Sequence, residues 1–356
     1  MSRWYRWLPA AAVPAVVAAA ALTSQAGAAD LPDKSPEDVL AMLADHSVEA
    51  FSGSSTQTSD LGLPALPSGA GGQGGDDLAQ AVDLLTGDHT GRAYVGGENT
   101  ARVQVMDSFS ERDLVVNGRD AWVYDSRDNS ALHLTLPKDA ARADAPAPAQ
   151  TPEELAQKFV DAVGPTTKLS VAQDVTVAGR DAYELVLTPR TDQTLVGSVA
   201  IAVDGDTGFP LRVTVDARGR TDPAFEVAYT SFTLGRPDPA RFEFAPPAGA
   251  SVEQKTVPDQ PAGGAPWMPG SGSAGGSTAP AGPAPTVVGK GWDAVVVLPP
   301  GAAADVTADP LLAQMTQAVD GGRLLSTALV NALITDDGRV LVGAVPVERL
   351  QSVAGS

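Results

Sequence analysis

Apolar residues alternate with polar ones along most of the chain, which is the pattern of half-buried β-strands. The apolar positions of the clearest runs are Trp122/Tyr124, Leu132/Leu134/Leu136, Tyr183/Leu185/Leu187, Val199/Ile201/Val203, Leu211/Val213/Val215 and Phe225/Val227/Tyr229. Pairs such as Asn117-Gly118 and Arg218-Gly219 lie between the runs and are typical of hairpin turns. Strands joined by tight turns pair antiparallel. The pattern therefore predicts a meander of nine or more strands that curls, because sheets twist, into an open or closed barrel.

Two segments combine helical spacing with helix-starting chemistry. Ser35 and Pro36 precede two acids and then Val39, Leu40 and Leu43, which predicts a helix over 36–47. A Thr-Pro-Glu-Glu start followed by Leu155, Phe159 and Val163 at intervals of four predicts a second amphipathic helix over 151–163.

A third, shorter helix is predicted over 76–86, where Leu78, Val82 and Leu85 share one face. It follows a stretch rich in Gly and Ser and ends at Gly87. Glycine on both sides predicts that this helix lies on a mobile loop.

The first 28 residues have the order of a secretory signal peptide. Arg3 and Arg6 precede an apolar run over 8–22, which is too short to span a membrane comfortably and is interrupted by Pro14. Ala26-Gly27-Ala28 then forms an A-x-A cleavage site. We expect cleavage after Ala28 and an exported, extracytoplasmic product, while retention of the segment as an anchor stays open.

The last hundred residues differ in composition from the alternating part. Residues 251–286 are rich in Gly and Pro and predict a linker. Residues 287–356 contain several apolar runs and an Asp336-Asp337-Gly338 turn. Because so short a segment buries little on its own, we expect it to add strands to the main sheet.

Charge and motifs narrow the chemistry. The chain has 43 acidic and 24 basic residues, a net charge of −19 and no cysteine, which argues against nucleic acid as a partner and excludes disulfides and thiolate chemistry. Its three histidines are isolated. No nucleophile elbow, zinc-protease or phosphate-loop motif occurs, and no Gly-x-Gly-x-x-Gly motif lies between a predicted strand and a predicted helix. Asp204-x-Asp206-x-Gly208 resembles the start of a calcium loop, but a hairpin turn explains it.

These observations predict a protein that is not an enzyme and holds no metal or cofactor. A secreted hydrolase is the enzymatic alternative. Replacing His46, His89 and His133 would test it, because activity that survived would exclude a histidine-based mechanism.

A long, curved antiparallel sheet has an apolar concave face that must be filled, capped by helices or left open for an apolar ligand. We expect a cavity covered by the three predicted helices as lids, with a solid core as the alternative. The predicted lining residues are Trp122, Tyr124, Leu132, Leu134, Tyr183, Leu185, Leu187, Val199, Ile201, Val203, Leu211, Val213, Phe225, Val227 and Tyr229, and the lid residues are Leu78, Val82 and Leu85.

Several motifs in this order resemble a known family. They are Phe51-Ser52-Gly53-Ser54, Gly118-Arg119-Asp120-Ala121-Trp122-Val123-Tyr124-Asp125, Tyr183-Glu184-Leu185-Val186-Leu187-Thr188-Pro189, Ile201-Ala202-Val203-Asp204, Gly208-Phe209-Pro210-Leu211 and Phe242-Glu243-Phe244-Ala245-Pro246-Pro247. Together they resemble the LolA-like superfamily, which includes the lipoprotein carrier LolA and the N-terminal domain of the envelope-stress regulator RseB (MucB). The resemblance covers roughly residues 30–250, and the residue bias of a GC-rich genome suggests an actinobacterial member.

The resemblance implies a mainly β fold with a few helices: an unclosed, strongly curved antiparallel half-barrel over 29–250 with a helical lid. It implies a non-enzymatic carrier for lipoprotein acyl chains or other lipids, with peripheral membrane contact. The alternative is a regulator that senses envelope lipoproteins and binds a membrane anti-sigma factor; a lipoprotein transporter is another candidate membrane partner. The linker and tail are absent from the plain carrier, which favours the two-part regulator somewhat.

Overall fold

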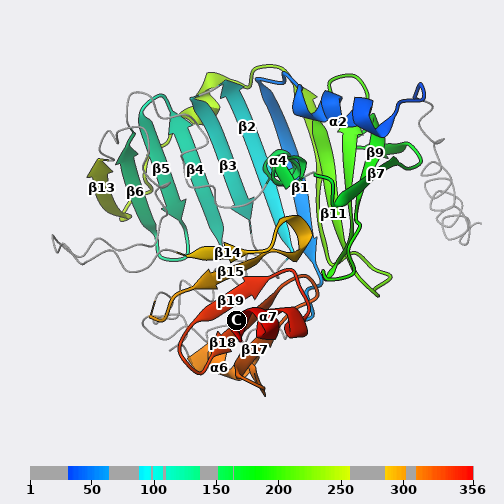
Figure 1. Ribbon diagram of the computed structural model, residues 1–356. Coiled ribbons are helices and arrows are strands. Elements are labelled where there is room, and N and C mark those ends of the chain that lie inside the picture. The colour runs from blue at the N-terminus through cyan, green and yellow to red at the C-terminus, as the bar shows by residue number, and fades with distance from the viewer. Residues whose placement is uncertain are drawn as a thin grey trace, which may run out of the picture.

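The computed structural model describes residues 31–63, 88–97, 99–106, 110–136, 151–162, 164–256, 285–301 and 310–355. Within these ranges the strands form a thirteen-stranded sheet and a separate six-stranded sheet (Figure 1). The predicted signal peptide, the predicted helix over 76–86 with Leu78, Val82 and Leu85, and most of the predicted linker lie outside the described residues.

The main sheet contains the predicted meander. Its strands are β1 (Phe51–Ser59), β2 (His89–Gly97), β3 (Thr100–Met106), β4 (Glu111–Asn117), β5 (Asp120–Asp125), β6 (Ser130–Thr135), β7 (Thr167–Val171), β8 (Val175–Val177), β9 (Arg180–Pro189), β10 (Val196–Asp204), β11 (Pro210–Ala217), β12 (Phe225–Leu234) and β13 (Ser251–Thr256). The strands follow the order β13-β6-β5-β4-β3-β2-β1-β12-β11-β10-β9-β7. Among the described residues, the two edge strands β13 and β7 do not pair with each other. The fold is therefore mainly β and the sheet is not closed, as predicted.

One edge of the main sheet departs from the prediction. β13 pairs parallel with β6, so the sheet is mixed and not wholly antiparallel. Residues 235–250 lead from β12, inside the sheet, to this edge, and they include the short helix η3 (Pro239–Phe242), which packs against β3 and β4. Residues 251–256, expected to begin a linker, are this edge strand.

The two helices predicted on capping chemistry are present as α2 (Pro36–Ala44) and α4 (Pro152–Ala162). The Ser35 hydroxyl accepts a hydrogen bond from the Asp38 N–H at 3.1 Å, which is an N-cap. α4 lies between β6 and β7 in the chain, and Figure 1 shows it against one face of the main sheet. α2 packs against β7, β9 and β10, and α4 against β11 and β12.

The predicted hairpin turns are confirmed by their glycines. Gly118, Gly208 and Gly219 have φ of +64°, +75° and +78° at the turns after β4, β10 and β11. This left-handed conformation strains residues with a side chain. Position 208 requires glycine for a second reason, since a Cβ there would lie 2.3 Å from the Met42 carbonyl oxygen of α2.

The second sheet corrects the expectation that residues 287–356 extend the main one. Its elements are β14 (Thr286–Val288), η4 (Gly291–Asp293), β15 (Val295–Leu298), α6 (Pro310–Met315), β16 (Gln317–Val319), β17 (Gly322–Ser326), β18 (Asn331–Thr335), β19 (Val340–Gly343) and α7 (Val347–Ala354). Its strands pair with one another, in the order β14-β15-β19-β18-β17-β16. α7 covers the sheet with Leu350, which packs with Val295, Leu333 and Leu341, so this short segment does bury a core of its own.

Direct contacts join the second sheet to the main one. The Trp292 indole N–H donates to the Thr167 hydroxyl at 2.9 Å, and the indole ring stacks on Phe159 of α4. The N–H of Leu195 donates to the carbonyl oxygen of Ala344 at 2.8 Å. No helix in the described part of the chain is long and apolar enough to cross a membrane.

Candidate ligand-binding face of the main sheet

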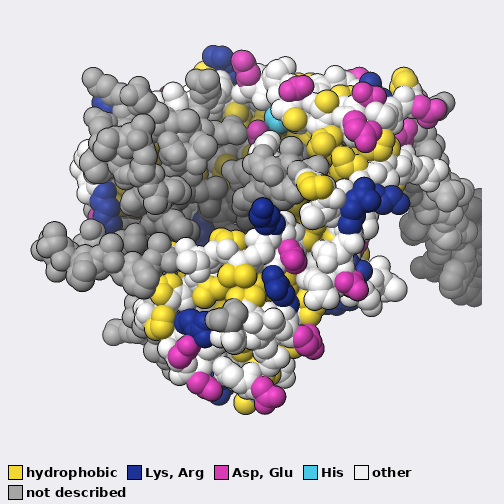
Figure 2. Space-filling view, in the orientation of Figure 1, with side chains coloured by type: hydrophobic (Ala, Val, Ile, Leu, Met, Phe, Trp, Pro, Cys, Tyr) yellow, Lys and Arg dark blue, Asp and Glu magenta, His cyan; other side chains and the backbone are white. Residues whose placement is uncertain are grey.

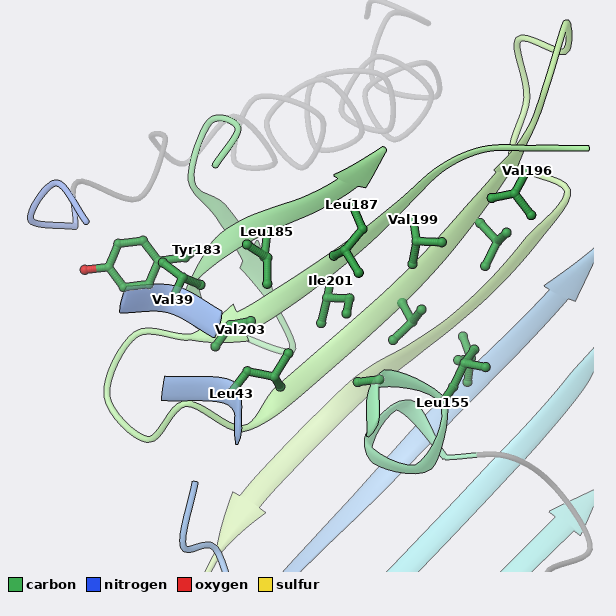
Figure 3. Close-up of a cluster of buried hydrophobic side chains, with 14 of the residues drawn as sticks. Val39, Leu43, Leu155, Tyr183, Leu185, Leu187, Val196, Val199, Ile201 and Val203 are labelled. Carbon is green, nitrogen blue, oxygen red and sulfur yellow. The ribbon is translucent and has the colours of Figure 1, made fainter. Parts of the chain in front are cut away.

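The half of the sheet formed by β7 and β9–β12 carries most of the predicted lining residues on one face. The pairing places Leu185 beside Ile201 and Ile201 beside Val213, so their side chains point the same way. The core cluster contains Tyr183, Leu185, Leu187, Val199, Ile201, Val203, Val213 and Val227, with Phe225 partly buried against it. Figure 3 shows Val39 and Leu43 of α2, and Leu155 of α4, among these side chains. This half is a packed core in the present conformation.

Leu211 and Tyr229 belong to a different, aromatic cluster. Phe51, Phe209 and Phe232 pack there, and the rings of Phe209 and Phe232 stack with centroids 4.9 Å apart. The two predicted lining residues therefore join a second buried cluster.

The strand pair β5–β6 separates the remaining predicted lining residues onto two faces. Trp122 pairs with His133, whereas Leu134 pairs with Ala121, and paired residues point to the same face. Trp122 and Tyr124 thus lie opposite Leu132 and Leu134. On their own face both rings pack against Phe244, at centroid distances of 5.4 and 5.9 Å. The expectation that all the lining residues share one face is wrong.

The register reveals an apolar surface that the sequence reading did not identify. We call it the wing face and define it as two rows that cross β2 to β6. The first row is Val95, Ala101, Val116, Ala121 and Leu134, and the second is Ala93, Val103, Leu114, Val123 and Leu132. Only Leu132 and Leu134 were predicted. The alternation of Ala101, Val103 and Val105 was a visible signal for a strand here.

A third row continues the wing face along the strands and is polar at one end. Val105 pairs with Arg112, Arg112 with Asp125, and Asp125 with Ser130. Arg112 is 8% exposed, and its Nε lies 3.4 Å from a carboxylate oxygen of Asp125. Its Nη2 is buried and has no hydrogen-bond partner. An apolar surface with a buried hydrogen-bond donor beside it is complementary in polarity to an amphiphile, which has an apolar chain and a polar head group.

The opposite face of β3 and β4 is occupied by the chain itself. Arg102 binds the Asp113 carboxylate through Nε at 3.0 Å and Nη2 at 2.5 Å, and donates to the Arg241 carbonyl oxygen of η3. Burial raises the pKa of Asp113 even though the hydrogen bond from Arg102 acts to lower it. This face therefore serves packing.

The calcium-like motif has a structural role in this fold, and the three histidines lie in different segments of the chain. Asp204 of the calcium-like motif accepts hydrogen bonds from Arg180 at 2.7 and 2.8 Å and from the Thr207 N–H. In the described ranges, no group of three or more His, Asp or Glu residues is placed to hold a metal ion. His46 precedes β1, His89 begins β2 and His133 lies in β6, bonded to Asp120.

No protein-family model and no curated protein matches the sequence. Solved structures do match. MucB of Pseudomonas aeruginosa, solved with MucA, is 18% identical with a TM-score of 0.44 and aligns over 90% of this chain and 96% of its own. A LolA superfamily protein of Nitrosomonas europaea is 10% identical (TM-score 0.25, 60% and 99% covered), and LprF of Mycobacterium bovis is 9% identical (TM-score 0.31, 59% and 99%).

A LolA superfamily protein and MucB, the two kinds of protein that the sequence motifs resemble, are thus among the matching structures. The actinobacterial origin stays a prediction. The TM-scores lie below 0.5 and the identities below 25%, so no function is taken from these structures.

Proposed function

We propose that this protein is an exported, non-enzymatic binding protein that holds acyl chains of lipoproteins or other lipids on the wing face. The observation that carries the proposal is two adjacent apolar rows that run without a polar interruption across five strands of an unclosed sheet. Four strand spacings give these rows a length of about 19 Å.

The free energy of burying an acyl chain on the wing face is compatible with both uptake and release. Val103, Val123 and Leu132 of the wing face are partly exposed, and its other members are buried. Burying a few hundred Å² of acyl chain yields several kcal/mol at about 25 cal/mol per Å². Because uptake must also displace whatever shields the buried members, the net affinity is reduced, which permits release. α2 and α4, the predicted lids, pack on the adjoining half of the sheet, so their action as lids over the wing face stays a prediction.

The test is native mass spectrometry of the protein purified from its own envelope, followed by organic extraction. We expect a bound acyl species that solvent releases. Leu185 and Ile201 are unsuitable for mutation because both are 0% exposed, and an aspartate there would disrupt the core.

Val123→Asp is the better variant, since Val123 is partly exposed on the wing face. It should lose lipid, whereas Thr90→Asp, at an exposed position on the opposite face of β2, should keep it. A lipid-free wild type that takes up no lipid on titration would contradict the carrier function.

One observation favours the regulator as a second candidate. The second sheet ends in β14, where Val287 is 64% exposed and pairs with the exposed Val296 of β15. Figure 2 shows apolar side chains at the surface over this sheet. An exposed apolar edge strand can take a strand from a partner. Recovery of a membrane protein, and no lipid, in the same purification would favour this function.

A further inference from the structure

We propose that Arg112 anchors the carbonyl oxygen of an ester- or amide-linked acyl chain whose hydrocarbon part lies on the wing face. This inference depends on the proposed lipid-binding function and names the ligand group recognised there. It assigns a polar end to a surface that is otherwise apolar.

The register places the anchor beside the apolar rows. Arg112 and Leu114 are two residues apart on β4, so their side chains share a face about 7 Å apart along the strand. Val105 of β3 pairs with Arg112 and continues the apolar surface up to the guanidinium. A ligand whose head group lies at Arg112 can therefore place its acyl chain on the second row at Leu114 and extend it along the row toward β2 or β6.

One buried nitrogen of the guanidinium, Nη2, has no hydrogen-bond acceptor. Its Nε faces Asp125 at 3.4 Å, while Nη2 is buried without an acceptor in a side chain that is only 9% exposed. Buried donors are almost always paired, since an unpaired one loses its hydration without compensation. A ligand oxygen at Nη2 restores that hydrogen bond.

The neighbouring charge selects the kind of oxygen. Asp125 already balances the positive charge of Arg112, so a second carboxylate would meet like charge in a partly buried place. A neutral carbonyl accepts the same hydrogen bond without that repulsion. The ligand class is thus an acyl ester or amide in preference to a free fatty acid or a plain hydrocarbon.

The experiment compares three probes of one chain length on the delipidated full chain: methyl palmitate, palmitate and hexadecane, each measured by displacement of an apolar dye. For the wild type we expect methyl palmitate to bind at least tenfold more tightly than hexadecane. Arg112→Leu should bind methyl palmitate and hexadecane with equal affinity, and its affinity for hexadecane should equal that of the wild type. Arg92→Leu, at an exposed position on the opposite face of β2, should behave as wild type.

Asp125→Asn provides a test that keeps Arg112 in place. Removing the balancing charge should move the preference toward palmitate by about tenfold. Equal wild-type affinities for methyl palmitate and hexadecane, or an ester preference that survives Arg112→Leu, would overturn the anchor alone. Should Arg112→Leu fail to fold, an unchanged preference in Asp125→Asn overturns it. Binding of none of the probes by the wild type overturns the proposed function and the anchor with it.

Discussion

Single buried charges decide local geometry in this chain, and Asp204 shows how. Its side chain is 1% exposed, and both oxygens accept from the Arg180 guanidinium. The hydrogen bond to Asp204 raises the pKa of Arg180 above its usual value, because it favours the charged guanidinium. The pair ties the start of β9 to the β10–β11 turn, which explains an acidic motif that resembles a calcium loop.

Asp204→Asn should therefore destabilise the fold by about 3 kcal/mol, because Arg180 loses its buried carboxylate partner and keeps only the exposed Asp206. The measurement is urea unfolding at neutral pH. Asp206→Asn is the matched control: Asp206 is 87% exposed and lies 3.4 Å from the same arginine, so its loss should change the stability by less than about 0.5 kcal/mol. Similar losses from both variants would contradict a special role for the buried carboxylate.

At the level of elements, the contact between α2 and the β10–β11 hairpin depends on Gly208. A methyl group there would lie 2.3 Å from the Met42 carbonyl oxygen and 2.9 Å from its carbon, so α2 would have to move. Gly208→Ala should cost about 1–3 kcal/mol beyond the strain of its positive φ. Because α2 would be displaced from the hairpin, hydrogen exchange of its amides should rise in this variant.

Gly219→Ala separates the two effects. Gly219 has nearly the same φ, +78° against +75°, but nothing lies within 4 Å of its added Cβ. It should show only the conformational strain, about 1 kcal/mol, with α2 exchange unchanged. Equal stability losses and equal exchange in the two variants would show that the contact with α2 contributes nothing.

Elements with strong local signals, and the antiparallel pairing of strands joined by tight turns, could be predicted from the sequence, whereas the register could not. Ser35 and Pro36 fix the start of α2, and alternation of large apolar residues marks β9 to β12. β2, with three glycines and few large side chains, gives a weak signal. The face to which Trp122 points depends on its pairing with His133, and a shift of one residue would reverse it.

The candidate site was less predictable than the strands for the same reason. The apolar rows of the wing face take two residues from each strand, and only the register shows that they are neighbours. Arg112 looked like one of many scattered basic residues. Its position between Val105 and Asp125, and its buried Nη2, follow from contacts that no local pattern encodes.

At the scale of the whole molecule, Trp292 joins the two sheets into one cooperative structure. The side chain comes from η4 of the second sheet but belongs to the core of the main one, where it contacts Thr167 and Phe159. It is 8% exposed. Since each sheet also has a core of its own, this contact decides whether the two unfold together.

The wild type should therefore unfold in a single calorimetric transition, and Trp292→Ala should separate it into two. Removing the indole costs about 3–5 kcal/mol, and that loss falls on the contact between the sheets and spares the core beneath α7. Trp292→Phe keeps a ring against Phe159 but loses the hydrogen bond to Thr167, so it should keep one transition at a cost of about 1 kcal/mol. Two transitions in the wild type would show that the sheets are already independent, and a single transition in Trp292→Ala would assign their coupling to the backbone bonds at Ala344 and Leu61.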